Sequence, residues 1–326
     1  NKIDKAKAEI KNNSIKFPAS MAIDGLGSSR LVELLERNKE LDEYLVSNDV
    51  LDHKKSGMDE DFIRKSTALQ TFGYTGEYEK AIAIGKEIYL DARIKNNRQQ
   101  IVLTAASYGQ SYHVIGDLQS CKEIIDEGLS LYDAAADSEL WKDVGMEPKA
   151  HLLIIKGYIE ACQGNVDVAY KYCEEAYLWS NKLGCRMFAD FGKVFACWIG
   201  YLCNDKAKTA SIMQTYLEEI SHDDLGWAGA YGTWLYEWAQ NKNENSENIL
   251  QEMYAQGRFG GLSVWEPMTC EYLIDKGEYD QVISKLTDTL ERVNQNNEKW
   301  GLPFVYKILA MAYEGRECAL TEQVQN

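Results

Sequence analysis

The chain has 326 residues, a formal net charge of −16 and an ordinary apolar content of 45%. The length allows two compact domains or one extended repeat array, and the composition excludes a disordered chain. The acidic balance and the lack of a basic run disfavour nucleic acid as a direct partner, because phosphate binding depends on clustered Lys and Arg.

Residues 1–58 are predicted as N-terminal linker and capping helices. A polar helix is expected near residues 1–13, and LVELLERNKELDEYL at 31–45 has the leucine spacing of a second helix. This segment is either a linker with a capping helix or the tail of an upstream domain. The sequence GLGSSR at 25–30 lacks the lysine of a phosphate loop, so no nucleotide or other cofactor is expected. The chain begins with Asn1, which suggests a fragment of a longer polypeptide.

Residues 59–326 are predicted as a repeat domain, because one turn pattern recurs along them. A glycine is followed two residues later by an apolar residue and five residues later by a residue suited to close packing. The copies begin at Gly76, Gly116, Gly164 and Gly277, with Asn204 in the glycine position of a weaker copy. Glycine readily adopts the left-handed conformation that ends a helix. Each copy therefore predicts the turn of a helical hairpin.

The spacing of these turns predicts about six to seven hairpins that average about 40 residues. The first helices are expected at about 59–72, 98–115, 148–163, 185–203, 225–240, 265–275 and 303–314. Their partners are expected at about 78–95, 118–134, 167–183, 206–220, 245–256 and 279–295. A degenerate turn is expected near NKNENSEN at 241–248. Pro148, Pro267 and Pro303 are each interpreted as the start of a first helix, where a missing N–H is tolerated. The fold class is all-α.

The eight cysteines include no C-x-x-C pair, and most stand in apolar helical runs. They are interpreted as buried reduced thiols, which favours a cytoplasmic location. The first thirty residues lack a signal-peptide core. The longest apolar run, VFACWIGYLC at 194–203, is about half a membrane span, so no membrane partner is expected.

The turn glycines, small residues and paired helices over roughly residues 59–315 resemble the tetratricopeptide (TPR) superfamily. The segment from Trp265 to the final helix looks like the last repeats of large bacterial signalling proteins. It carries a W-x-P start, a G-E-Y turn and an E-K-W stretch at Glu298–Trp300. In those proteins an adenylyl-cyclase or DNA-binding module is joined to a STAND-type ATPase and a helical-repeat sensor. The resemblance implies a right-handed TPR-like α-solenoid that works as a sensor or scaffold.

No catalytic or metal site is predicted, because the four histidines lack zinc-site spacing and no nucleophile motif occurs. Asp223-Asp224 lacks the third aspartate of a metal motif and is interpreted as a helix cap. In TPR arrays the first helices line the concave groove, so the resemblance implies that a ligand would contact them. The candidate residues are Gln110, His113, Tyr158, Trp198, Tyr201, Trp234, Glu237, Trp265 and Glu271. For His113 a structural role remains the alternative.

The stretch GWAGAYGTWLYEW at 226–238 places Trp227, Tyr231, Trp234 and Trp238 on one helical stripe. The stripe is either a packed seam between repeats or an aromatic wall that faces a ligand. Gly226, Gly229 and Gly232 predict the close approach of a neighbouring helix, since glycine is unfavourable inside a helix unless space demands it.

Three functions remain open from the sequence. The leading hypothesis is a non-enzymatic module that senses a peptide, a protein or a small effector in its groove, as part of a larger signalling protein. The second is a constitutive scaffold or a homo-oligomerisation element. The third is an enzyme, which would require a closed pocket with converging ionisable groups.

Overall fold

The computed structural model describes residues 60–141, 146–219, 226–242, 246–255 and 260–325, with short pieces of 2–6, 8–9, 33–34, 37 and 40–41. Helices are the only regular elements in these ranges, which confirms the all-α prediction. The described N-terminal pieces are helical and fall within the two predicted N-terminal helices. Most of the predicted linker and capping segment, including GLGSSR, lies outside the described residues, as does Asp223-Asp224.

The helices alternate between two sets, as the turn pattern predicts. The first-helix set consists of α3 (Glu60–Thr75), α5 (Arg98–Val114), α9 (Pro148–Cys162), α11 (Arg186–Leu202), α13 (Gly226–Ala239), α15 (Leu262–Asp275) and α17 (Leu302–Gln325). The partner set consists of α4 (Tyr78–Ile94), α6 (Leu118–Leu131), α10 (Val166–Leu183), α12 (Lys206–Glu219), α14 (Ser246–Ala255) and α16 (Tyr279–Gln295). A single extra turn, α7 (Ala134–Asp137), follows α6.

The predicted turn residues all adopt the left-handed conformation. Gly76, Gly116, Gly164 and Gly277 have φ between 77° and 85°, and Asn204 has φ 54°. Asn241, in the predicted degenerate turn, also has a positive φ, of 57°. The packing residue of the turn pattern lies five positions after each of the four glycines and Asn204. All five packing residues are fully buried, namely Ala81, Cys121, Ala169, Thr209 and Val282. The pattern therefore marks real helix ends, and its packing position lies in the interface between the two helices.

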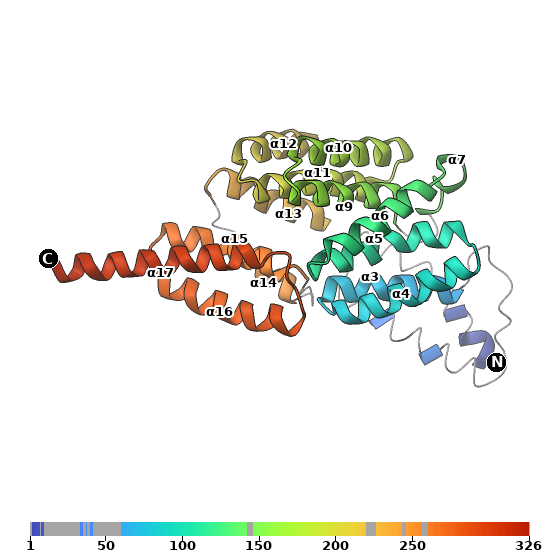
Figure 1. The fold of residues 1–326 in the computed structure, drawn as a ribbon, viewed down its shortest axis with the longest axis horizontal. Helices are drawn as coiled ribbons and strands as arrows, with labels where there is room; N and C mark the ends of the chain where they lie inside the picture. Colours follow the sequence, from blue (N-terminus) through green and yellow to red (C-terminus); the bar gives the residue numbers. More distant parts are fainter. Residues whose placement is uncertain are drawn as a thin grey trace.

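Consecutive helices of the two sets pack against one another along the chain. Neighbouring members of the first-helix set also contact one another from α3 to α13, and α15 contacts α17. Figure 1 shows α9, α11 and α13 beneath the outer helices α10 and α12, while α15–α17 extend to the left towards the C-terminus. The first helices from α3 to α13 thus lie towards the middle of the molecule, where their inner faces can share a site.

The helix starts follow the predicted capping chemistry except at Pro267. Pro148 stands in the first turn of α9, and the Glu147 carboxylate caps that helix by accepting from the Ala150 N–H. Pro303 is the second residue of α17. The prediction that Pro267 begins a helix is wrong, because α15 begins at Leu262 and Pro267 lies inside it. The helix begins earlier because Gly261, with φ 83°, provides the reversal of the chain before it.

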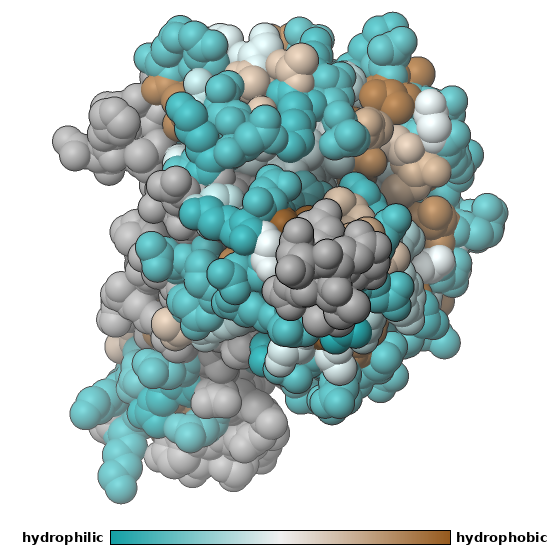
Figure 2. Space-filling view, turned by 90° about the vertical axis from the view of Figure 1, so that its left-hand side faces the viewer, coloured by the Kyte–Doolittle hydropathy of each residue, from teal (hydrophilic) through white to brown (hydrophobic). Residues whose placement is uncertain are grey.

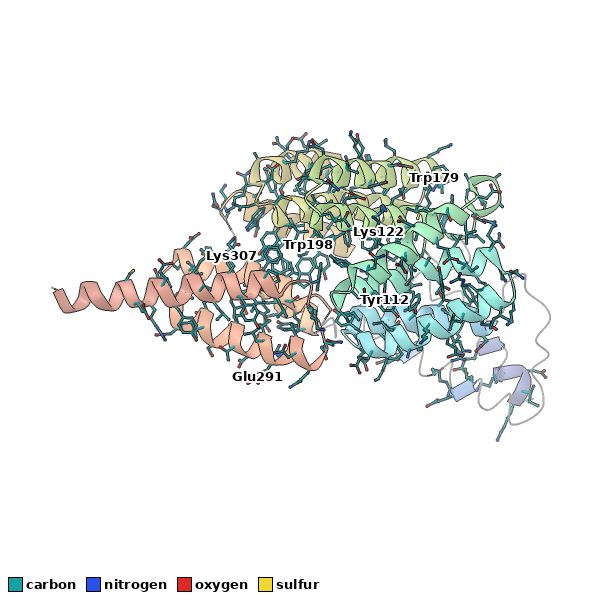
Figure 3. All side chains as sticks on the ribbon, in the orientation of Figure 1. Tyr112, Lys122, Trp179, Trp198, Glu291 and Lys307 are labelled. Atoms are coloured by element: carbon teal, nitrogen blue, oxygen red, sulfur yellow. The ribbon has the colours of Figure 1, made fainter. Side chains whose placement is uncertain are left out.

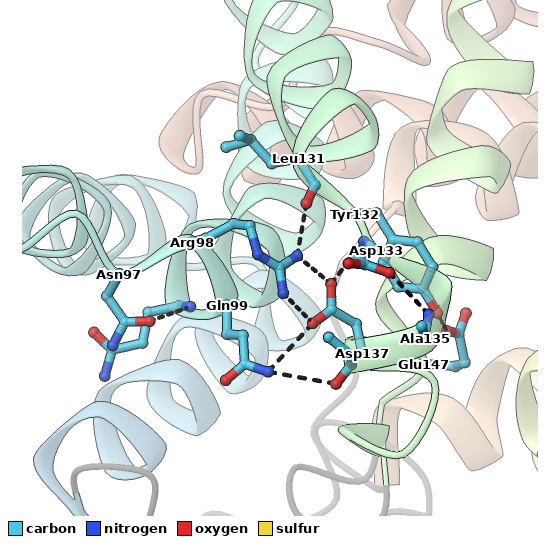
Figure 4. A network of polar contacts seen from close by, with 11 residues as sticks. Asn97, Arg98, Gln99, Leu131, Tyr132, Asp133, Ala135, Asp137 and Glu147 are labelled. Atoms are coloured by element: carbon cyan, nitrogen blue, oxygen red, sulfur yellow. Dashed lines mark hydrogen bonds and ion pairs between the residues drawn. The ribbon is translucent and has the colours of Figure 1, made fainter.

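A partly buried ion pair fixes α7 to α5 (Figure 4). The Arg98 guanidinium donates to Asp137 Oδ1 at 2.7 Å and to the Leu131 carbonyl at 2.7 Å. Asp137 is fully buried and also accepts from the Asp133 N–H at 2.8 Å. Burial alone would raise the pKa of Asp137, but the hydrogen bond from Arg98 and those from its other donors lower it. The carboxylate therefore stays charged and holds the end of the second hairpin.

All eight cysteines are free thiols, and five of them are buried, as the sequence predicts. Cys162, Cys203 and Cys318 are exposed, so the prediction of burial is wrong for these three. Burial raises the pKa of Cys121 and of Cys173 to about 12, so these thiols are neutral packing groups.

The face seen in Figure 2 is mostly hydrophilic, with hydrophobic side chains gathered along one side.

Candidate functional site

One pocket lies where the inner faces of the first helices converge. Its cavity volume is about 110 Å³, and its walls come from α3, α4, α5, α9, α11, α13 and α15. The segment 260–261 before α15 and Trp300 before α17 complete the lining. In Figure 3 the labelled Trp198 points to the place where these groups of helices meet. A cavity of about 150 Å³ can hold a benzene ring, so a cavity of this order suits one small compound.

Aromatic rings form most of one wall. The ring centroid of Trp198 lies 4.0 Å from that of Trp265 and 6.3 Å from that of Trp300. Trp300 in turn lies 5.4 Å from Tyr158, and Tyr231 lies 4.5 Å from Trp265. Rings at such separations support one another through edge and offset contacts, which fixes their orientation. The wall is therefore rigid and presents apolar surface to the pocket.

Three polar side chains of the lining have atoms with no hydrogen-bond partner among the described residues. These atoms are Gln70 Oε1, the Tyr158 hydroxyl and both ring nitrogens of His113. The side chains are only 4%, 2% and 4% exposed, respectively. Burying such groups unpaired is costly, typically about 1–3 kcal/mol each. Unpaired groups of this kind concentrate where a ligand supplies the missing partner.

Several other polar groups of the pocket already have partners. Gln110 Oε1 lies 3.1 Å from His151 Nε2, and the Ser111 hydroxyl donates to the Ser107 carbonyl at 2.9 Å. The Ser107 hydroxyl faces the Met146 sulfur at 3.8 Å. In the described part of the chain, Gln70, His113 and Tyr158 are the lining residues whose buried polar side-chain atoms lack a partner.

His113 is held neutral by its surroundings. Burial lowers its pKa to about 4, and its ring lies 4.5 Å from Tyr158 and 5.3 Å from Trp300. A neutral imidazole has one N–H donor and one acceptor nitrogen. His113 can therefore both donate to and accept from a bound molecule.

A buried carboxylate joins the two ends of the described repeat region beside the pocket. Glu298 is 1% exposed and accepts from the Tyr78 hydroxyl at 3.1 Å, the Ser263 N–H at 2.9 Å and Trp300 Nε1 at 3.1 Å. The Ser263 hydroxyl and the Gly261 N–H donate to it as well. Burial raises the pKa of Glu298, and these donors oppose that rise. We call these five residues the Glu298 clasp.

Backbone contacts reinforce the Glu298 clasp. The N–H groups of Lys299 and Trp300 both donate to the Val114 carbonyl, at 2.8 and 3.1 Å. The Gly260 N–H donates to the Tyr74 carbonyl at 3.0 Å. Segments 260–263 and 298–300 are thereby attached to α3, α4 and α5. Gly260, Gly261 and Trp300 of these segments belong to the pocket lining, so the attachment fixes part of its wall.

Five of the nine predicted groove residues line the pocket: Gln110, His113, Tyr158, Trp198 and Trp265. The other four lie on first helices but outside its lining. Tyr201 stacks on Phe304 with centroids 5.3 Å apart, and Glu271 accepts from Trp238 Nε1 at 2.7 Å. Trp234 is completely buried and stacked 5.0 Å from Trp265, and Glu237 is half-buried on α13.

The aromatic stripe of α13 combines both interpretations drawn from the sequence. Trp234 and Trp238 are core residues, whereas Tyr231 lines the pocket. A Cβ at Gly232 would collide with the Met213 side chain of α12, so the predicted close approach exists there. The side chain of Trp227 and the surroundings of Gly226 and Gly229 lie outside the described residues.

Gln70 and Trp300 are pocket residues that the sequence analysis missed. Gln70 lies on α3, and none of the nine predicted groove residues belongs to that helix. Trp300 belongs to the E-K-W stretch, but it precedes its helix, so the assignment of sites to first helices passed it over. The clasp joins residues about 180 to 220 positions apart, and no local pattern reports such a contact.

No protein-family model matches the chain, and no curated protein matches it significantly. Among the described residues, no three His, Cys, Asp or Glu side chains gather as metal ligands. No helix in the described ranges is both long and apolar enough to cross a membrane.

Proposed function

We propose that the chain is a non-enzymatic sensor module that binds a small effector in the pocket between its first helices. The observation that carries this proposal is the convergence of three buried, unpaired polar side chains, Gln70, His113 and Tyr158, on one aromatic-walled pocket. The elements come from across the repeat region, so a ligand there would contact most of its hairpins at once.

We further propose that the hairpins form a right-handed TPR-like α-solenoid of six to seven units. The recurrence of left-handed turn residues at the predicted positions supports this arrangement. The contacts between successive first helices from α3 to α13 also support it, because each unit of a solenoid contacts its neighbours. We propose a cytoplasmic location from the interpretation of the cysteines as reduced thiols, and a place within a larger signalling protein from the sequence resemblance.

A small effector is favoured over a peptide or protein ligand. The Glu298 clasp and the backbone bonds at Val114 and Tyr74 bridge the two ends of the described repeat region beside the pocket. An extended peptide requires an open groove with backbone groups to pair along its length. The bridged pocket instead suits a compact molecule that is largely enclosed on binding.

Binding is favoured over catalysis by the chemistry of the lining. No Asp, Glu, Lys or Arg is among the pocket residues in the described part of the chain. The ionisable side chains of the pocket are His113 and several tyrosines, and the pKa of Tyr78 and of Tyr158 is raised by burial. General acid–base catalysis needs a group that titrates near the working pH.

The proposal is tested by replacing Gly73 with larger residues whose side chains fill the pocket. A Cβ added to Gly73, on the pocket wall of α3, would meet no atom within 4 Å. We expect Gly73→Leu and Gly73→Phe to fold and to lose effector binding progressively, with Gly73→Ala as the matched control. A compound library is screened by thermal shift and calorimetry against the wild type and this series. If no compound binds in a manner that Gly73→Phe blocks, the sensor proposal fails.

A constitutive assembly role is the second candidate, favoured by the exposed side chains of α17. Tyr306, Met311 and Tyr313 on this helix are 55%, 40% and 43% exposed. Light scattering coupled to size exclusion would show a concentration-independent oligomer if α17 serves assembly. A monomer whose hydrodynamic size responds to an effector would support the sensor instead.

A further inference from the structure

The pocket has a chemical character that narrows its ligand. Its described lining holds no Asp, Glu, Lys or Arg, and most of it is apolar or aromatic. A charged ligand would lose its hydration shell there without gaining a counter-ion from the lining, which is unfavourable. We propose that the pocket binds an uncharged compound with a planar ring and one or two hydrogen-bonding groups. This inference rests on the proposed sensor function and specifies its ligand.

We expect the ligand to contain a planar ring because one wall of the pocket is aromatic. Trp198, Trp265 and Trp300 belong to a connected group of rings whose centroids lie 4.0 to 6.3 Å apart. A flat ring can join such a group through the same edge and offset contacts that the rings already make. An aliphatic molecule of equal size would gain the burial without those contacts. The wall therefore favours an aromatic or heteroaromatic ligand.

We expect the ligand to carry few polar groups, because few side chains of the lining have buried atoms without a hydrogen-bond partner. Gln70 Oε1 accepts, the Tyr158 hydroxyl donates or accepts, and neutral His113 does one of each at its two nitrogens. A carboxamide, a phenol or a ring N–H would satisfy these groups. A sugar would bring more hydroxyls than the three side chains can pair, and each unpaired hydroxyl is penalised on burial. Polyhydroxylated ligands are therefore disfavoured.

The charge requirement is tested with ligands that share one ring and differ in charge. Calorimetry compares the amide, the carboxylate and the ammonium derivatives of benzene, indole and naphthalene, for example indole-3-acetamide, indole-3-acetate and tryptamine. We expect the neutral amide of at least one ring to bind at least about tenfold more tightly than both charged partners. The ammonium compound is the stricter comparison, because the chain's net charge of −16 attracts cations.

The polar contacts are tested with Tyr158→Phe and Gln70→Leu. Because the Tyr158 hydroxyl has no partner in the described structure, its removal is expected to leave stability unchanged or slightly higher. Affinity for the amide is expected to fall about five- to tenfold, whereas affinity for the unsubstituted ring hydrocarbon stays the same. Tyr170→Phe is the matched control, since the Tyr170 hydroxyl is also buried and unpaired but lies outside the pocket.

Several results would overturn the inference. A carboxylate or ammonium compound that binds as tightly as its amide would show that charge is tolerated. A sugar that binds while every ring series fails, or no binding by any neutral amide, would exclude the ligand class. If library compounds still bind in a manner blocked by Gly73→Phe, only the ligand class is lost. If none does, the sensor function itself is lost.

Discussion

The Tyr78 hydroxyl donates a hydrogen bond to Glu298 Oε2 over 3.1 Å, although 220 residues separate the two in the chain. Tyr78 follows the first recurring turn, and Glu298 opens the E-K-W stretch before the last helix. The same hydroxyl accepts from the Gly261 N–H at 3.0 Å. One buried contact thus ties together three separate segments around the pocket mouth.

Glu298→Gln is expected to weaken the clasp. An amide replaces one acceptor oxygen by an NH₂ group, which would face donors such as the Ser263 N–H. Leaving such buried donors unpaired costs about 1–3 kcal/mol of unfolding free energy. Urea denaturation followed by tryptophan fluorescence measures the change. Tyr78→Phe removes one donor to Glu298 and one acceptor of the Gly261 N–H, but that N–H keeps its bond to Glu298. The expected cost is therefore smaller, at about 1 kcal/mol. Equal stability of Glu298→Gln and the wild type would contradict this role of the clasp.

Gly260→Ala is expected to disturb the attachment of segment 260–263 to α3. A Cβ at Gly260 would lie 2.8 Å from the Gly73 carbonyl oxygen and 3.0 Å from that of Tyr74, and backbone atoms cannot move away cheaply. We expect a loss of about 1–3 kcal/mol, the usual cost of overpacking. Gly73→Ala on the opposite side of the same contact is the control, since its Cβ meets nothing within 4 Å. A melting temperature of Gly260→Ala at or above that of Gly73→Ala would show that the contact is not formed in solution.

Trp234→Ala is expected to destabilise the fold by about 3–5 kcal/mol, because it removes a fully buried ring. Trp234→Phe keeps an aromatic ring beside Trp265 and removes an indole N–H that has no partner in the described structure. The phenylalanine variant should therefore lose clearly less, about 1–2 kcal/mol. Chemical denaturation separates the two. Similar losses in both variants would mean that the ring itself contributes little.

Much of the architecture could be predicted from local sequence, and the reasons are visible at particular residues. Gly76, Gly164 and Gly277 end helices because their conformation is intrinsically accessible to glycine, which requires no knowledge of the rest of the fold. Pro267 was misplaced because a proline signal cannot distinguish a helix start from an interior position made tolerable by its surroundings.

The site was harder to predict because it depends on contacts distant in sequence. The resemblance to TPR arrays implied that His113 and Trp198 lie on the groove side of first helices. The same resemblance placed Trp234 among them, although Trp234 is completely buried against Trp265 and lies outside the pocket lining. Trp300 reaches the pocket only because its N–H binds the Val114 carbonyl, a contact that no spacing in the sequence encodes.

Glu266 is expected to make stability depend on pH near neutrality. It is 3% exposed on α15, its Oε1 accepts from the Tyr254 hydroxyl, and its Oε2 lies 4.0 Å from Lys285 Nζ. Burial raises its pKa from 4.5 to about 7, with opposing effects from Lys285 and Arg292 and reinforcing ones from Glu247 and Asp288. Below pH 4.5 the group is protonated in both the folded and the unfolded state. As the pH rises towards 7 the unfolded state ionises more easily, so the folded state loses stability.

The full loss of unfolding free energy caused by the raised pKa of Glu266 is on the order of 3 kcal/mol, since one pKa unit corresponds to about 1.4 kcal/mol. Glu266→Gln cannot ionise and should lack this loss, so its stability relative to the wild type rises between pH 5 and 8. Buried His113 and His151, whose pKa is lowered to about 4, contribute the opposite slope, but they do so in both proteins and cancel in the difference. Urea denaturation across this pH range measures that difference, with exposed Glu278→Gln as the control for removal of one charge. A constant difference between Glu266→Gln and the wild type from pH 5 to 8 would mean that Glu266 ionises as readily in the folded state as in the unfolded chain.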